Sequence, residues 1–446
     1  MKSVCMFVWN HFTNDARVLR ECSALAEAGY EVDLIALQDP KNKELPKEEM
    51  RPEGFRVIRV KRQPSILVNA LKFAKKTYQW VSEKRTRQIG AGLVGAGLFL
   101  LAPITMLALG AAVGTILLPQ VRKQIVNASA MLEMVFASTK KSYDFYHAND
   151  LNTLPQALLA GKVFNKGRIV YDSHEVQTDR TGYGYIQSNL EGWLLPFVDT
   201  MMVENHTRAA HNEELYGFYP YVLHNYPFYR PLDFSLRKDL HALLDLPKDE
   251  KILLYQGGIQ AGRGLEQLVL AAKDFKEGTL VMIGDGKLKP TIQQLIETEG
   301  VGDRVKMIDK VPVEALPYYT MNAYLGFQVL NNVCFNHYSA SSNKLFEYLM
   351  AEVPVVSCDF PEIERVVAGN DVGVLVDSHD PQSIADGVNR MIEDQALYAR
   401  VKENTKTARE KYNWDLEKEA LLNVYANAAE RKLPIMKDGA PKPVQS

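Results

Sequence analysis

The chain is poor in cysteine and has no excess of charge of either sign. Its 446 residues include four cysteines, which form no CxxC pair and no Cys/His spacing of a metal site. The sequence therefore argues against a disulfide scaffold and favours a reducing cytosol. With 54 acidic and 52 basic residues the net charge is −2, so no global positive field attracts nucleic acid.

The first 30 residues lack the unbroken apolar core of a signal peptide, because charged side chains such as Arg17 and Glu21 interrupt it. Apolar residues make up 46% of the chain and charged residues 24%, which argues against a disordered chain, a collagen or a polytopic membrane protein. At roughly 150 residues per domain, the length predicts two or three domains.

One stretch, residues 89–118, carries no charge at all. A helix needs about 20 apolar residues to cross a bilayer, but Pro103 divides this stretch into two shorter halves. Basic residues flank it on both sides, which places both ends on the cytoplasmic face. We expect a helix–break–helix hairpin that dips into one leaflet; the alternatives are a full span and a buried helical hairpin in an oligomer interface.

The residues that precede this stretch are basic and amphipathic. Residues 61–88 contain eight lysines and arginines against one acid, Glu83, with aromatic and aliphatic residues between them. This composition suits the anionic headgroups of a membrane surface. We therefore expect a monotopic or peripheral protein on the cytoplasmic face of the inner or plasma membrane.

The rest of the chain alternates short apolar runs with helical patterns, which is typical of parallel α/β sheets. The first series has strands at 3–9, 31–37, 55–60, 142–147 and 168–172, with helices at 15–28 and 153–163. A proline- and aromatic-rich segment, 220–232, reads as an interdomain linker. The second series has strands at 251–255, 279–283, 304–308, 323–329, 353–357 and 373–376, and helices at 264–275, 287–299, 342–351, 381–393 and 414–430.

Three segments of the second series have the residues of an anion site. Residues 255–265 (YQGGIQAGRGL) place glycines after a strand and a basic residue before a helix. Residues 283–287 (IGDGK) form a similar turn, and residues 342–348 (SNKLFEY) put an amide, a lysine and a glutamate at a helix start. Ordinary βα turns, and a surface helix with a Lys/Glu pair, are the alternatives.

Polar residues also follow two strands of the first series, in the segments HAND (147–150) and YDSHE (171–175). Because the carboxyl ends of parallel strands meet at one edge of a sheet, we expect these side chains to share a ligand-facing rim. No HExxH-like spacing supports a metal site there.

Taken in order, these segments resemble the retaining glycosyltransferases of family 4 (glycosyl transferase group 1), which have the GT-B fold of two Rossmann-like domains facing a cleft. The matching pieces also include NDARVLRECSALAEAGYEV near the start and KYNWDLEKEALLNVY near the end. The resemblance is greatest to bacterial members that build surface polysaccharides and glycolipids.

This resemblance implies a domain plan. Residues 1–225 would be the acceptor domain, with residues 61–135 as its membrane-associating insert, and residues 226–408 would bind the nucleotide sugar. A helix at 409–431 would pack back on the N-terminal domain, and residues 432–446 would form a mobile tail.

The resemblance also implies roles for individual residues, with no metal and no cofactor. Arg263 and Lys344 would hold the donor diphosphate, and His147 and Asn149 would complete the catalytic set. The donor would be bound by Gly257, Gly258, Gly284, Asp285, Asn343, Leu345 and Glu347, with its base near Val311. The acceptor side would be lined by Asn14, Asp15, Asp150, His174 and Glu175.

Two positions depart from the family pattern. Ser339 stands where the first glutamate of the E-x7-E pattern is expected, with Asn331, Asn332 and residues 336–342 as candidates to replace it. Asn149 stands where the second histidine of a His-x-His pair is common. The contacts to the donor sugar are therefore expected to differ from those of the family.

The predicted function is transfer of a sugar from a UDP- or GDP-linked donor to a lipid-linked acceptor, such as a polyprenyl-diphosphate sugar. The absent glutamate favours one alternative, a catalytically impaired nucleotide-sugar-binding scaffold at the membrane. A sugar-nucleotide epimerase, which shares the two-domain fold, is the second alternative. Its substrate would be soluble, so the apolar insert argues against it.

Overall fold

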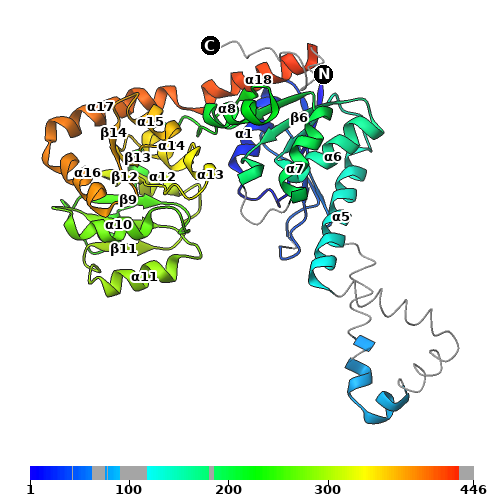
Figure 1. Ribbon diagram of the computed structural model, residues 1–446, viewed down its shortest axis with the longest axis horizontal. Helices are drawn as coiled ribbons and strands as arrows, with labels where there is room; N and C mark the ends of the chain where they lie inside the picture. The colour runs from blue at the N-terminus through cyan, green and yellow to red at the C-terminus, as the bar shows by residue number, and fades with distance from the viewer. Residues whose placement is uncertain (43, 63–75, 78, 91–117, 180–184, 431–446) are drawn as a thin grey trace. The chain divides into compact units, whose positions relative to one another are not determined.

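The computed structural model describes residues 1–42, 44–62, 76–77, 79–90, 118–179 and 185–430 (Figure 1). The chain divides into two compact units, Met1–Val18 with Leu25–Ile169, and Leu19–Ala24 with Val170–Ser446. The predicted hairpin at 89–118 lies outside the described residues except at its two ends, and so does the predicted tail. In the described ranges, no helix is both long enough and apolar enough to cross a membrane.

The first unit is built on a largely parallel sheet with the order β3-β4-β2-β1-β5. Its central strands are largely apolar and buried on both faces, as expected of parallel strands covered by helices, although β2 also contains the buried Asp33. Only the short β3 runs antiparallel to its neighbour. The strands are β1 (Ser3–Phe7), β2 (Glu31–Leu37), β3 (Glu48–Met50), β4 (Arg56–Val60) and β5 (Phe145–Asn149).

Helices α1 (Ala16–Glu27) and α5 (Pro119–Ser138) accompany this sheet, and α5 contacts both β2 and β4. The helix expected at 153–163 is divided: α6 (Leu154–Leu158) continues directly into a π-helical segment, Leu159–Phe164. The strand expected at 142–147 instead begins at Phe145 and extends through Asn149.

The second unit begins with three parallel strands, β6 (Arg168–Ser173), β7 (Thr200–Val203) and β8 (Tyr221–Val222), of which β6 crosses the division between the units. Helix α7 (Tyr185–Leu194) and helix α8 (His206–Tyr216) connect them. The polar residues of α8 give no clear sequence signal, but the Asn205 side chain caps it by accepting a hydrogen bond from the Arg208 amide at 2.9 Å.

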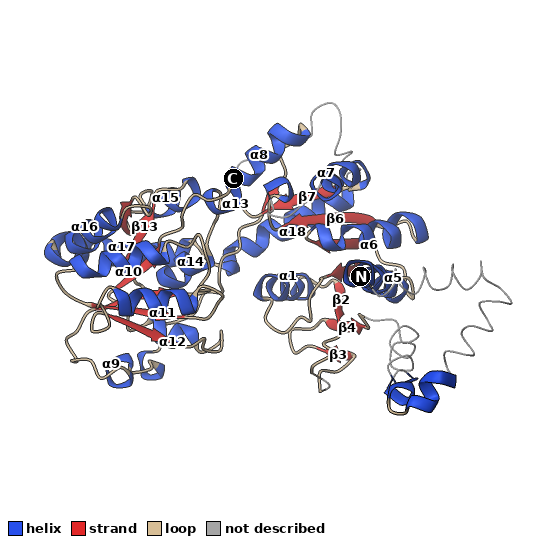
Figure 2. Cartoon of the chain, turned by 60° about the horizontal axis from the view of Figure 1, so that its bottom comes forward, coloured by secondary structure: helices blue, strands red, loops and turns tan. Residues whose placement is uncertain are grey.

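A six-stranded parallel sheet with the order β11-β10-β9-β12-β13-β14 forms the rest of this unit. Alternate residues of β9 point to opposite faces: Leu253 and Tyr255 join one buried apolar cluster, while Ile252 and Leu254 join the other. Figure 2 shows helices on both sides of these strands. The strands are β9 (Ile252–Gln256), β10 (Thr279–Ile283), β11 (Val305–Ile308), β12 (Leu325–Gln328), β13 (Val355–Cys358) and β14 (Gly373–Val376).

The helices of the remaining chain confirm most of the predicted pattern, and the ranges expected at 381–393 and 414–430 match α16 and α18. The charged α17 has only a weak apolar stripe and is not predicted. The helices are α9 (Leu240–Leu243), α10 (Leu265–Ala271), α11 (Lys289–Thr298), α12 (Leu316–Thr320), α13 (Phe335–Tyr338), α14 (Asn343–Met350), α15 (Pro361–Val367), α16 (Pro381–Glu393), α17 (Gln395–Lys411) and α18 (Trp414–Glu430). Single 3₁₀ turns occur at Leu151–Thr153, Gln177–Asp179, Leu195–Phe197, Phe234–Leu236 and Ala272–Asp274.

Close packing of α14 on β12 gives a test of this core. A Cβ at Gly326 would lie 2.5 Å from Cγ of the fully buried Tyr348, which has no room to move. We expect Gly326→Ala to lower the free energy of unfolding by about 1–3 kcal/mol, measured by urea denaturation. Gly302→Ala, at an exposed position with no atom within 4 Å, is the matched control and should stay within about 0.5 kcal/mol. Equal effects would contradict this packing.

Candidate functional site

Tyr255, near the carboxyl end of β9, organises the glycine turn that follows it. Its ring is buried, and its hydroxyl donates a hydrogen bond to the carbonyl oxygen of Gly258 at 2.9 Å. Gly257 has φ +127°, a backbone conformation that favours glycine, and its amide donates to the Ile283 carbonyl at 2.9 Å. The turn is therefore held from two sides while its outer backbone stays partly accessible.

Lys344, in the first turn of α14, lies against this turn. Its ammonium nitrogen is 4.7 Å from the centre of the Tyr255 ring, and its Cε would be 3.5 Å from a Cβ placed on Gly257. The side chain is 6% exposed, and within the described part of the chain its Nζ has no hydrogen-bond partner. Burial, assisted by the nearby Arg263 charge, lowers the pKa of Lys344 to about 7.

Arg263, just before α10, is the second cation of this cluster. It interacts with the Tyr255 hydroxyl, whose pKa is raised to about 12 by burial and lowered in part by this guanidinium. Arg263 is half-buried and also acts electrostatically on Lys344. Two cations thus face one tyrosine and one glycine turn, and this arrangement favours an anionic ligand.

The second predicted turn adjoins the first. The Ile259 amide donates to the Asp285 carbonyl at 2.9 Å, and a Cβ on Gly284 would lie 1.9 Å from the Gly257 carbonyl oxygen. Such close approach of two backbones requires glycine at 284. Asp285 itself is exposed, and its carboxylate accepts a hydrogen bond from the Gly286 amide at 2.8 Å.

Glu347 lies one turn along α14 from Lys344 and is largely buried. Its Oε2 accepts a hydrogen bond from Gln256 Nε2 at 2.8 Å, and the Gln256 oxygen in turn accepts one from the Thr320 hydroxyl at 2.7 Å. Burial raises the pKa of Glu347 against the lowering effects of Gln256 and Lys344. The last residue of β9 thus orients the carboxylate.

Three other predicted donor residues have different surroundings. Leu345 is buried in the apolar cluster beneath α14, and Val311 packs partly buried against the same cluster. Asn343 is exposed, and its Oδ1 accepts a hydrogen bond from Asn225 Nδ2 at 2.9 Å. The structure therefore brings Gly257, Gly258, Arg263, Gly284, Lys344 and Glu347 together around the ends of β9 and β10.

In the first unit, His147 and Asn149 are buried residues inside β5 rather than residues after it. The strand expected to end at His147 therefore ends two residues later, because pairing with β1 continues through Ala148. The Asn149 amide nitrogen donates to the Phe7 carbonyl at 3.0 Å. Asp150, with φ +66°, is the first residue beyond the strand.

Asn14 and Asp15 precede α1. Asn14 is exposed, whereas the Asp15 carboxylate accepts hydrogen bonds from Asn10 Nδ2 at 2.7 Å and from the Val18 amide at 3.2 Å. Asp15 thereby satisfies a free amide at the start of the helix, a structural role for a residue predicted to face the acceptor.

In the second unit, the ring of His174 pairs with the fully buried Asp172, at 2.9 Å between Nε2 and Oδ2. The Glu175 carbonyl accepts a hydrogen bond from the Gln177 side chain at 3.0 Å. Asp172 ends up within β6, so this segment also begins inside its strand.

Ser339, which stands in place of the expected glutamate, is fully buried. Its hydroxyl accepts a hydrogen bond from Arg208 Nε at 3.2 Å, and its carbonyl accepts one from Asn205 Nδ2 at 2.7 Å. Asn336, a candidate replacement, exchanges hydrogen bonds with the Val176 backbone. These polar groups are engaged by the chain itself.

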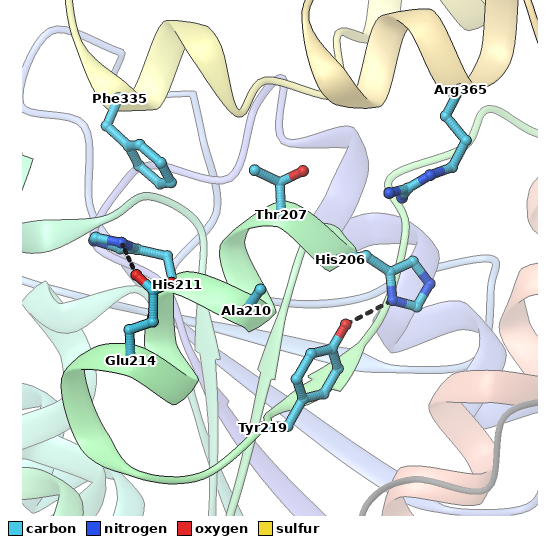
Figure 3. Close-up of a pocket in the computed structure, with 8 residues that line it drawn as sticks. All are labelled: His206, Thr207, Ala210, His211, Glu214, Tyr219, Phe335 and Arg365. Atoms are coloured by element: carbon cyan, nitrogen blue, oxygen red, sulfur yellow. Dashed lines mark hydrogen bonds and ion pairs between the residues drawn. The ribbon is translucent and has the colours of Figure 1, made fainter.

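A cavity of about 470 Å³ lies beside α8 (Figure 3). The His206 ring forms a hydrogen bond with the Tyr219 hydroxyl at 2.8 Å. The His211 ring contacts Phe335 with centroids 4.3 Å apart and the two planes tilted by 33°. Burial lowers the pKa of His206. None of the predicted site residues lines this cavity, and its main polar groups already pair with one another.

The positioning residues Tyr255, Gln256 and Thr320 are missed by the sequence reasoning. Tyr255 and Gln256 belong to the YQGG segment, in which only the glycines are predicted to bind the donor. The alternation of side chains along a strand is the signal that places these two side chains on opposite faces. Thr320 is distant in sequence and has no local signal.

Part of the second unit is similar to a known protein family. Residues 237–408 match the family model described as Glycosyl transferases group 1. The D-inositol 3-phosphate glycosyltransferase of Xylanimonas cellulosilytica is 30% identical over 207 residues, 45% of this chain and 48% of that protein. The alpha-D-kanosaminyltransferase of Streptomyces kanamyceticus is 28% identical over 160 residues, 35% and 40% of the two chains. The chain thus spans about half the length or less of these curated relatives.

Solved structures match over nearly the whole chain. Sucrose-phosphate synthase from Thermosynechococcus elongatus has a TM-score of 0.66 at 16% identity, covering 96% of this chain and 99% of that one. HepE of Anabaena, solved in complex with UDP-glucose, has a TM-score of 0.65 at 14% identity, covering 96% and 100%. These matches confirm the predicted GT-B-like α/β fold, and with the named relatives they support the prediction of a transferase.

Proposed function

We propose that the protein is a retaining, metal-independent glycosyltransferase that moves a sugar from a UDP- or GDP-linked donor to a lipid-linked acceptor, for surface polysaccharide or glycolipid synthesis. One observation carries the proposal: the buried Lys344 ammonium has no hydrogen-bond partner in the described ranges and faces a glycine turn beside Arg263. A buried ammonium group without a hydrogen-bond partner is costly, and an anion that binds there would supply the missing partner.

The donor diphosphate is that anion. Arg263 offers a planar fork of donors to two phosphate oxygens, and Lys344 adds a point charge. As the bond to the sugar breaks, negative charge grows on the leaving diphosphate, and both cations stabilise it more strongly in a site that water does not fill. The two cations thus supply the positive charge that a metal provides in other transferases.

Glu347 would hold the donor ribose. A carboxylate has about four acceptor positions, and Gln256 occupies one of them. Ribose hydroxyls can donate to the others. That HepE was solved with UDP-glucose supports a UDP-sugar as the first donor to test. The proposal of retention rests on the likeness of the sequence motifs to family 4.

The apolar and basic insert supports the choice of a lipid-linked acceptor at the cytoplasmic membrane face. A cleft held at the bilayer surface would meet an amphiphilic acceptor by diffusion in two dimensions. Basic residues flank the uncharged stretch in the sequence, which suits an anionic surface: Lys84, Arg85 and Arg87 precede it, and Arg122 and Lys123 follow it.

Turnover provides the first test. The full chain would be incubated with UDP- and GDP-sugars and a membrane lipid extract, and nucleoside diphosphate release would be measured. We expect release with at least one donor, and a loss of roughly 10²–10³ in kcat/KM for Arg263→Ala and for Lys344→Ala. Lys248→Ala, an exposed lysine of the same unit, should behave as the unaltered chain. Nucleotide binding without release would instead support the scaffold, and no binding would reject both.

The pKa of Lys344 gives a second test. In the free protein this group is mostly neutral above a pH of about 7, whereas bound phosphate favours its charged form. Binding of UDP must then take up a proton, so affinity should fall by up to about tenfold per pH unit between pH 7 and 9. Calorimetry in buffers of different ionisation enthalpy would measure both quantities.

Lys344→Arg is the matched control for that experiment, because arginine stays charged throughout this range. Its affinity profile should be flat between pH 7 and 9, whatever its absolute value. A flat profile for the unaltered protein would show that Lys344 does not face the diphosphate.

The membrane insert gives a third test. Replacing residues 89–118 by a short Gly/Ser linker should move the protein from the membrane fraction to the soluble fraction after lysis, because the apolar anchor is lost. A chain shortened by residues 433–446 controls for loss of a segment and should stay with the membrane. If the linker variant remains fully membrane-bound, the stretch is not the anchor.

A further inference from the structure

A second cavity, of about 640 Å³, lies in the first unit and has no part in the donor site. Its volume falls within the roughly 300–1,000 Å³ of small-molecule sites. Three segments line it: the residues after β2, the residues after β4, and the first turns of α5. The lining residues are Gln38, Asp39, Pro40, Lys61, Arg62, Pro119, Arg122, Lys123, Val126 and Asn127.

The wall of this cavity is strongly basic. Four of the ten lining residues are cations, and Asp39 is the one carboxylate among them. Asp39 already accepts a hydrogen bond from the Lys41 amide at 2.8 Å, which fixes it in a local turn. Like charges gathered around a hollow repel one another, and a bound anion removes that repulsion.

The start of α5 adds positive potential to the same cavity. This helix has 20 residues, its first turn holds no acid, and Leu118 at its N-cap provides no side-chain hydrogen bond. The free amides of a helix start carry about half a positive charge, which acidic residues usually neutralise. Here Arg122 and Lys123 lie close to that end instead, so the local charge favours an anion from outside the chain.

Three cations of this wall are exposed to solvent. Arg62, Arg122 and Lys123 are exposed, so their charged ends can reach a ligand without losing a buried partner. The Asn127 side-chain oxygen is buried and, in the part of the chain that the structure describes, accepts no hydrogen bond. This oxygen is an acceptor and does not bond a phosphate oxygen, so the affinity for an anion comes from the cations and the helix start.

We propose that this cavity binds the phosphate group of a phosphorylated ligand, through Arg62, Arg122 and Lys123. The proposal rests on the proposed function and deepens it, because it assigns the phosphate of a lipid-linked acceptor, or of an anionic lipid headgroup, to a site in the predicted acceptor domain. The two sides of the cavity flank residues 63–118 in the sequence, so a phosphate held here lies at the root of the apolar insert. A soluble phosphorylated compound shares this chemistry.

The test uses the full chain without nucleotide sugar, so that its result can be interpreted even if no transferase activity is found. One arm titrates inorganic pyrophosphate by calorimetry, with Arg263→Ala/Lys344→Ala present in every chain compared, so that the proposed donor site takes up no pyrophosphate. The other measures co-sedimentation with phosphatidylcholine vesicles, with and without phosphatidic acid. Arg122→Glu/Lys123→Glu is compared with Lys140→Glu/Lys166→Glu, which changes the net charge equally at exposed positions of the same unit.

We expect the unaltered chain and the control to bind, and the cavity variant to lose at least tenfold in affinity. Loss in both arms supports the site for lipid and soluble phosphates alike; loss only with vesicles identifies a lipid headgroup, and loss only with pyrophosphate identifies a soluble ligand. Equal binding by both variants, or no binding by the unaltered chain, overturns the proposal. If thermal unfolding shows that the glutamate variant is misfolded, Arg122→Gln/Lys123→Gln replaces it under the same criteria.

Discussion

The candidate site of the second unit is centred on one buried ammonium group, that of Lys344. Lys344 lies against the ring of Tyr255 with its Nζ unpaired in the described ranges, and its pKa is lowered to about 7 from the ordinary 10.5. The folded chain therefore binds fewer protons than the unfolded chain between these pH values, so this group contributes stability that increases as pH rises from about 7 to 10.5. Near neutral pH it weakens the fold, a common cost of a site built for a ligand.

The surrounding residues keep that charge in place. The Tyr255 hydroxyl holds the glycine turn, and its ring face attracts the ammonium group. Gln256, the next residue, points the opposite way and orients Glu347. One strand end thus positions a cation site on one side and a carboxylate on the other, because consecutive side chains of a strand alternate between faces. The close approach of Gly284 to Gly257 brings the next strand end to the same place.

The first unit also gathers positive charge, but on exposed side chains. Its basic residues lie on exposed segments around a cavity instead of in a buried turn, so they remain hydrated. The helix start of α5 and the end of β4 supply this charge from opposite ends of a long insert. An anion that binds there would meet several weak contacts, whereas the donor site offers two cations of which one is almost fully buried.

Local pattern was enough to predict the alternation of strands and helices, the glycine turns after β9 and β10, and the Lys344–Glu347 spacing on α14, because each depends on residues close in sequence. The strand ends at His147 and Asp172 were misplaced, since pairing with a neighbouring strand decides where a strand stops. The contacts of Thr320 with Gln256 and of Ser339 with Arg208 join residues 64 and 131 positions apart, and no local signal encodes them. Burial lowers the pKa of Lys344 and favours a bound anion. This burial arises only when α14 packs on the sheet, so the tertiary structure decides it.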